Sequence, residues 1–116
     1  MPLYGLKLLT AGGTSLSDTY PRVTYPVGEW VDVPGNGAYV AMTGNVDAGG
    51  EGPLLAQMEC KKPTGADAPN GVVCFRRVRR LAGVDMEWVK SLSVSIRRAV
   101  ALYGNDAQRD FLLHDP

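Results

Sequence analysis

The sequence predicts an α+β fold, in which a mostly antiparallel sheet of four to six short strands packs against a C-terminal amphipathic helix. Two observations lead to this prediction. Residues 3–81 contain several short segments with alternating apolar and polar side chains, separated by turns rich in glycine and proline. Residues 85–103 instead repeat apolar side chains at helical spacing. We expect one globular domain, 1–116, with 107–116 as a short terminal helix or tail.

The first half of the chain predicts three short strands. Residues 3–10 alternate imperfectly and end before a Gly-Gly turn. Residues 27–33 end in a second strand, and the Pro-Gly-Asn-Gly sequence at 34–37 is a strong turn signal. Residues 38–42 form the third strand, and the glycine-rich residues 43–53 are expected to be a loop.

Residues 54–81 predict a hairpin. Its first arm, residues 54–60, alternates with a period of two, as a half-buried strand does. The sequence that follows, KKPTGADAPN, contains two prolines and runs into an Asn-Gly pair, so we expect a loop at 61–70. The second arm, residues 72–81, begins with the strong β-formers Val-Val-Cys-Phe.

The second arm of this hairpin becomes cationic over its last residues. Alternation predicts that Arg76 and Arg80 point to the same side as Val78, and that Arg77 and Arg79 point to the other side. Unpaired charges are too costly to bury. The end of this strand must therefore reach solvent, an acidic neighbour on the same chain, or a partner.

The charges are distributed unevenly along a chain whose formal net charge is zero. Residues 1–60 carry two basic and six acidic side chains, a net of −4. Residues 61–98 carry nine basic and three acidic side chains, a net of +6, and residues 99–116 carry one and three, a net of −2. This pattern fits a basic surface for an acidic partner. It also fits acidic and basic segments that meet within the fold or across a homo-oligomer interface.

We predict that the basic segment binds a partner, an acidic protein surface in preference to nucleic acid. The candidate partner-binding residues are Lys61, Lys62, Arg76, Arg77, Arg79 and Arg80. The same cations would serve for phosphates, but only Phe75 adds an aromatic ring to the cluster and no nucleic-acid-binding motif is present. A third interpretation is that the arginines protect an edge strand from pairing with another sheet.

The last third of the chain predicts a helix. Asp85 is placed to cap it, and Gly104 to end it. One apolar stripe, expected to pack on the sheet, consists of Trp88, Leu92, Ile96, Ala99 and Tyr103. Serines in the middle of this segment weaken the helix, so an alternative start lies near residues 93–95.

The residues that usually carry catalysis or bind metals are sparse. A symmetric hairpin would bring Cys60 and Cys74 nearly opposite each other, as a disulfide requires. The N-terminus carries no secretion signal, so we expect a cytoplasmic protein with both thiols reduced and structural. His114 is the only histidine. We predict no catalytic residue, no metal and no cofactor, and the apolar runs are too short for a membrane span.

The order of several short motifs resembles a group of small uncharacterised domains of actinobacteria and their phages. These motifs are YPVGEW at 25–30, GNGAYVA at 35–41, GPLLAQMEC at 52–60 and VVCFRRVRRL at 72–81, followed by a Trp-containing helix. The resemblance covers roughly residues 22–103. It implies a non-enzymatic accessory or interaction protein, located in the host cytoplasm if a phage encodes it.

A fainter resemblance is to ADP-ribosyltransferases, which would make the chain an NAD-using enzyme. That family uses a Gly-x-Tyr strand ahead of a catalytic glutamate, a pattern onto which Gly37, Tyr39 and Glu59 fall. The first strand departs from the family, because Gly5-Leu6-Lys7 stands where the family has His or Arg.

Overall fold

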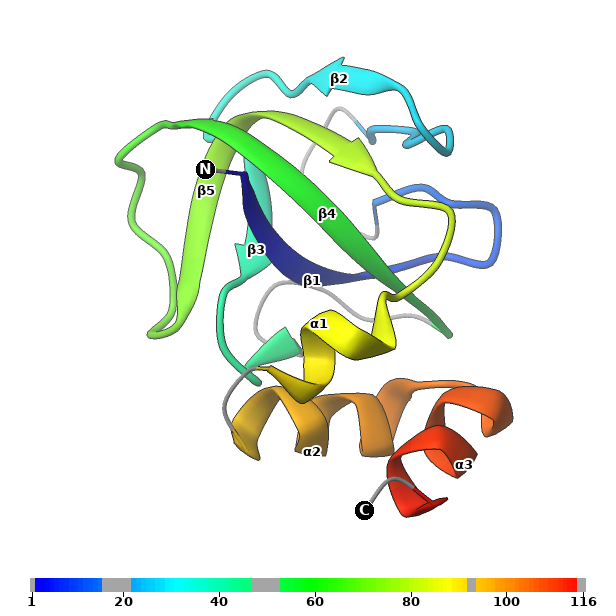
Figure 1. The fold of residues 1–116 in the computed structure, drawn as a ribbon. Helices are drawn as coiled ribbons and strands as arrows, with labels where there is room; N and C mark the ends of the chain where they lie inside the picture. The colour runs from blue at the N-terminus through cyan, green and yellow to red at the C-terminus, as the bar shows by residue number, and fades with distance from the viewer. Residues whose placement is uncertain (1, 16–21, 47–52, 92–93, 115–116) are drawn as a thin grey trace.

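The computed structural model describes residues 2–15, 22–46, 53–91 and 94–114. These residues form five strands and three helices (Figure 1). The strands are β1 (Leu3–Leu9), β2 (Trp30–Asp32), β3 (Ala38–Ala41), β4 (Leu54–Pro63) and β5 (Val72–Arg80). The helices are α1 (Met86–Lys90), α2 (Val94–Tyr103) and α3 (Asp106–His114).

The five strands form one antiparallel sheet that closes on itself. The strand order is β2-β5-β3-β1-β4, and an additional pairing of β4 with β5 closes a small barrel (Figure 1). The sequence correctly predicts an antiparallel sheet followed by helices, but not its closure. β5 makes the closure possible, because its first half pairs with β3, its second half pairs with β2, and β4 lies along its other edge.

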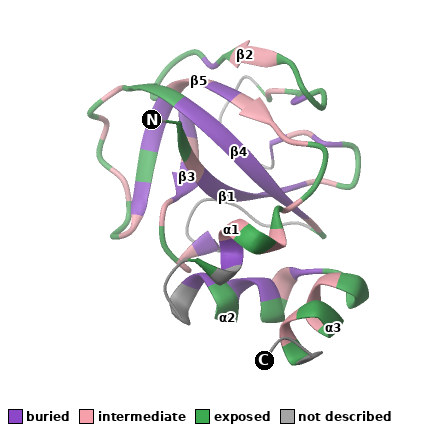
Figure 2. Ribbon diagram, viewed as in Figure 1, coloured by how far each residue is buried: buried purple, intermediate pink, exposed green. Residues whose placement is uncertain are grey.

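Two apolar clusters hold this arrangement together. The first fills the barrel and includes Leu9, Val40, Met58 and Phe75, contributed by four different strands. The second lies between the barrel wall and the helices. Its buried members are Leu6, Leu8, Ala41, Val46, Leu55, Val89, Ile96, Ala99 and Val100. Figure 2 shows the buried segments along the strands and on the sides of α1 and α2.

The contact between β1 and β3 is unusually close. Gly5 faces β3, where an added Cβ would collide with the side chain of Val40 and lie 2.8 Å from the carbonyl oxygen of Ala41. Only one residue pair, Leu6 with Ala41, forms a ladder between these strands. The Nζ atom of Lys7 donates a hydrogen bond of 2.7 Å to the carbonyl oxygen of Tyr39 beside it. A side-chain hydrogen bond therefore also joins the two strands at this seam of the barrel.

β4 extends further than the sequence predicts. It continues past Cys60 through Lys61 and Lys62 to Pro63, which pairs with Phe75. Lys62 has a positive φ of 58°, and the proline stands at the end of the strand, where a missing amide donor is tolerated. The prediction of a loop from residue 61 was wrong, and the correction places Lys61 on the barrel wall.

The predicted single helix is two helices. α1 ends at Ser91, whose hydroxyl donates a hydrogen bond of 2.7 Å to the carbonyl oxygen of Trp88. Such local side-chain bonds compete with a continuing helix. Ile96 and Ala99 of the predicted stripe are buried, whereas Trp88 is half-buried and Leu92 lies outside the described residues. Val89 and Val100, which the stripe left out, are fully buried. Val100 follows Ile96 by four residues, so it shares the buried face of α2.

The expected cap at Asp85 is present, and a second cap precedes α3. Asp85 accepts hydrogen bonds from the backbone amides of Glu87 and Trp88 at the start of α1. At the start of α3, the side chains of Asn105 and Gln108 each accept a hydrogen bond of 2.9 Å from the other's backbone amide, the reciprocal arrangement of a capping box.

None of the helices among the described residues has the length and apolar character needed to cross a membrane.

Candidate partner-binding face

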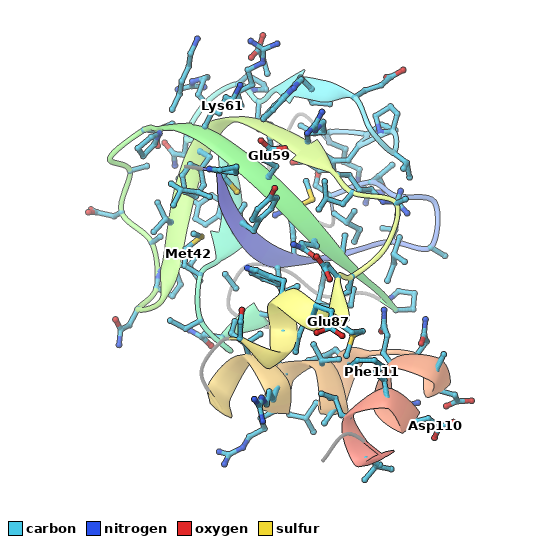
Figure 3. All side chains as sticks on the ribbon, viewed as in Figure 1. Met42, Glu59, Lys61, Glu87, Asp110 and Phe111 are labelled. Carbon is cyan, nitrogen blue, oxygen red and sulfur yellow. The ribbon has the colours of Figure 1, made fainter. Side chains whose placement is uncertain are left out.

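Six side chains share one outward face of the barrel wall formed by β2, β5 and β4. The strand register places Trp30, Arg79 and Glu59 side by side in one row. The next row on the same face consists of Asp32, Arg77 and Lys61. We call this surface the Trp30 face, made up of Trp30, Asp32, Glu59, Lys61, Arg77 and Arg79. Figure 3 shows Glu59 and Lys61 along β4, with Lys61 at the end of the barrel away from the helices.

Three cations gather around the indole ring of Trp30. The ring centroid lies 4.3 Å from Nζ of Lys61, 5.0 Å from Cζ of Arg79 and 5.5 Å from Cζ of Arg77. Each distance is within the range of a cation–π interaction, which contributes about 0.5–1 kcal/mol at exposed sites. The indole therefore orders basic side chains that come from two different strands.

Two carboxylates of the same face pair with the arginines. Arg79 donates to Glu59 in an ion pair, in which the Glu59 side chain is only 11% exposed. Arg77 lies 3.8 Å from Asp32, whose side chain is 74% exposed. With three cations and two carboxylates, the formal charge of the face is +1. Of the nine basic side chains in residues 61–98, Arg77 and Arg79 are thus paired within the fold with carboxylates from residues 1–60.

The Nε atoms of Arg77 and Arg79 are buried, and neither has a hydrogen-bond partner. Buried polar atoms of this kind usually have an acceptor. The Trp30 ring lies over both guanidinium groups, and an aromatic face is a weak acceptor for N–H groups. The indole thus shields these atoms from water without giving them a conventional hydrogen bond.

The other two arginines lie on the opposite side of the wall, as alternation predicts. Arg76 donates hydrogen bonds to the carbonyl oxygens of Val33 at 2.6 Å and of Gly35 at 2.8 Å, which fixes the turn between β2 and β3. Arg80 donates to the carbonyl oxygen of Tyr25 at 3.3 Å. Their positions suit a structural role, and they do not contribute to the Trp30 face.

Lys62 is exposed next to the Trp30 face, at the position of positive φ. Of the six predicted partner-binding residues, the structure thus brings together Lys61, Arg77 and Arg79. It adds Trp30, Asp32 and Glu59, which sequence reasoning missed. Trp30 and Asp32 do alternate along one strand, but no sequence signal shows that this strand pairs with the arginines.

The barrel also buries a second group of ionisable side chains, Lys7, Cys60 and Cys74. Both cysteines are free and buried. Cys60 pairs across the hairpin with Val78, so the idea that the thiols lie opposite each other was wrong. Burial raises the pKa of Cys60 to about 12 and also raises the pKa of Cys74. Thiols with raised pKa values stay protonated near neutral pH, and only the thiolate is a nucleophile. Cys60 and Cys74 are therefore inert.

Lys7 gives the fold a specific pH dependence. Burial lowers the pKa of Lys7 from 10.5 to about 8, so its charged form opposes folding below pH 8 and this penalty disappears as the pH rises to 10.5. We expect the free energy of unfolding of the wild type, relative to Lys7→Met, to rise by roughly 2–3 kcal/mol between pH 7 and pH 10. Urea unfolding of both proteins at each pH measures this difference. Both proteins contain Cys60 and Cys74, so the effects of thiol titration on stability largely cancel in the comparison. A difference that stays constant with pH would contradict the assignment.

The residues of the ADP-ribosyltransferase pattern lie on separate strands. Gly37 precedes β3 and Tyr39 lies within it, whereas Glu59 lies on β4, and β1 stands between these strands in the sheet. The Glu59 carboxylate is held by Arg79. Lys7, in the first-strand position of that pattern, is buried and bound to the carbonyl oxygen of Tyr39. Among the described residues, no group of three or more His, Cys, Asp or Glu side chains is placed to hold a metal ion.

Comparisons with models of protein families, with curated proteins and with solved structures give no significant match to the chain.

Proposed function

We propose that this chain is a non-enzymatic interaction protein that binds an acidic segment of another protein through the Trp30 face. The observation that carries this proposal is the gathering of Lys61, Arg77 and Arg79 around one indole ring on an outward face of the barrel. Tryptophan and arginine are the residues most enriched at the energetic centres of protein interfaces. Here the closed barrel holds them in fixed positions, which lowers the entropy cost of binding.

The charge balance of the face favours a protein partner over a nucleic acid. Nucleic-acid binding draws its affinity from the neutralisation of many phosphates. The Trp30 face has a formal charge of only +1, because Glu59 and Asp32 already pair with its two arginines. A face of this kind suits one or a few carboxylates.

Charge reversal on the face tests the proposal. Proteins retained from a nuclease-treated lysate of the source cells by the immobilised wild-type chain are identified by mass spectrometry. We expect Lys61→Glu to reduce the retained amount of acidic proteins by roughly tenfold, because like charges then face each other across the contact. Lys61 is exposed, so its replacement leaves the melting temperature nearly unchanged.

Arg98→Glu is the matched control. Arg98 is an exposed residue of α2, which lies at the other end of the molecule from β2 (Figure 1). The change in charge is the same, so the control should retain the acidic proteins that Lys61→Glu loses. Equal retention by the two variants would refute a role for the Trp30 face. Retention that is seen in an untreated lysate but lost after nuclease treatment would instead indicate nucleic acid.

A further inference from the structure

The two ion pairs of the Trp30 face differ in how firmly they are held. The carboxylate of Glu59 is largely buried and bonds directly to Arg79. Asp32 is mostly exposed, and its Oδ1 lies 3.8 Å from Nε of Arg77, beyond hydrogen-bond distance. Exposed ion pairs of this kind are worth only about 0–1 kcal/mol. Asp32 can therefore leave Arg77 at little cost, whereas Glu59 cannot leave Arg79.

Arg77 stands directly opposite Lys61 in the register of β4 and β5. Lys61 is exposed, and among the described residues no carboxylate pairs with it. The row Asp32–Arg77–Lys61 thus contains two cations and one loosely held anion. It is the part of the face where an incoming carboxylate gains most.

We propose that a carboxylate from an acidic polypeptide segment displaces Asp32 from Arg77 and binds between Arg77 and Lys61. This inference rests on the proposed function, and it assigns Asp32 as an internal competitor that weakens binding. The face already binds carboxylates of its own chain at both arginines, which argues for a carboxylate ligand. Arg79 and Glu59 keep the indole in place and do not exchange.

The test uses a fluorescein-labelled peptide of ten glutamates as the probe, with fluorescence anisotropy as the readout. We expect Asp32→Asn to bind this peptide about threefold more tightly than the wild type, in line with the small cost of separating an exposed ion pair. Arg77→Gln should lose most of the binding. Asp32→Ser is a second variant at the same exposed position and should behave like Asp32→Asn.

A direct signal comes from Trp30 itself. The chain has two tryptophans, so Trp88→Phe leaves Trp30 as the only one. Binding between Arg77 and Lys61 changes the charges around the indole, and we expect the peptide to shift or quench the emission of this variant. Absence of any spectral change at saturating peptide would overturn the placement of the ligand.

The outcomes separate the inference from the proposed function. If the wild type and Lys61→Glu bind the peptide equally, or neither binds it, the proposed function fails. If only the wild type binds, but Asp32→Asn binds no more tightly, the Trp30 face stands and the exchange at Arg77 is overturned. If a ten-residue oligothymidylate bound more tightly than the glutamate peptide, the ligand group would be a phosphate, and the assignment of a carboxylate would be overturned.

Discussion

Replacement of Gly5 by alanine is expected to lower the free energy of unfolding by roughly 3 kcal/mol, the upper end of the usual cost of overpacking a core. The new methyl group would collide with Val40 and lie 2.8 Å from the carbonyl oxygen of Ala41 and 2.9 Å from Sδ of Met42. A side chain can rotate away, but the carbonyl belongs to the backbone of β3. The strand itself must therefore shift at the seam of the barrel.

Gly83→Ala is the matched control for this change. Gly83 has open space around the position of an added Cβ atom, so the same methyl group should be neutral or slightly stabilising there. Urea unfolding of the two variants and the wild type measures the difference. Equal midpoints for Gly5→Ala and Gly83→Ala would show that β1 and β3 do not approach as closely as described.

Reversal of the charge at Arg79 is expected to cost roughly 2–4 kcal/mol of stability, near the cost of breaking a buried ion pair. Arg79→Glu would place a second carboxylate beside Glu59, whose side chain is only 11% exposed. It would also remove a cation from the Trp30 ring. Thermal and urea unfolding measure the loss.

Two further variants isolate the cause of this loss. Arg77→Glu, in the neighbouring row, faces the exposed Asp32 and should cost less than about 1 kcal/mol. The exchanged pair Glu59→Arg with Arg79→Glu restores opposite charges and should recover part of the stability. If the exchange is no more stable than Arg79→Glu alone, the ion pair is not the reason for the loss.

The sequence predicted the parts of this fold that local pattern controls. Alternation located the strands and correctly assigned Arg76 and Arg80 to one side of β5 and Arg77 to the other. Helix capping at Asp85 was also predicted correctly from residue type. These features depend on neighbours in the chain, which the sequence displays directly.

The features that were missed depend on contacts between distant segments. The pairing of Trp30 with Arg79 joins residues far apart in the sequence, and no local pattern specifies it. The same holds for the closure of the sheet and for the burial of Lys7 against β3. The end of β4 at Pro63 was missed because a proline usually marks a turn, whereas here it completes a strand.

The register of β1 also determines the order in which the chain can assemble. Leu3 pairs with Cys60 and Leu9 with Leu54, so β1 docks only after a long intervening segment has been closed. β4 and β5 are joined by a much shorter connection, and we expect this hairpin to form first. During synthesis β1 leaves the ribosome before β4, so it must wait for the strand with which it pairs. We expect this late long-range step to limit the folding rate of the chain.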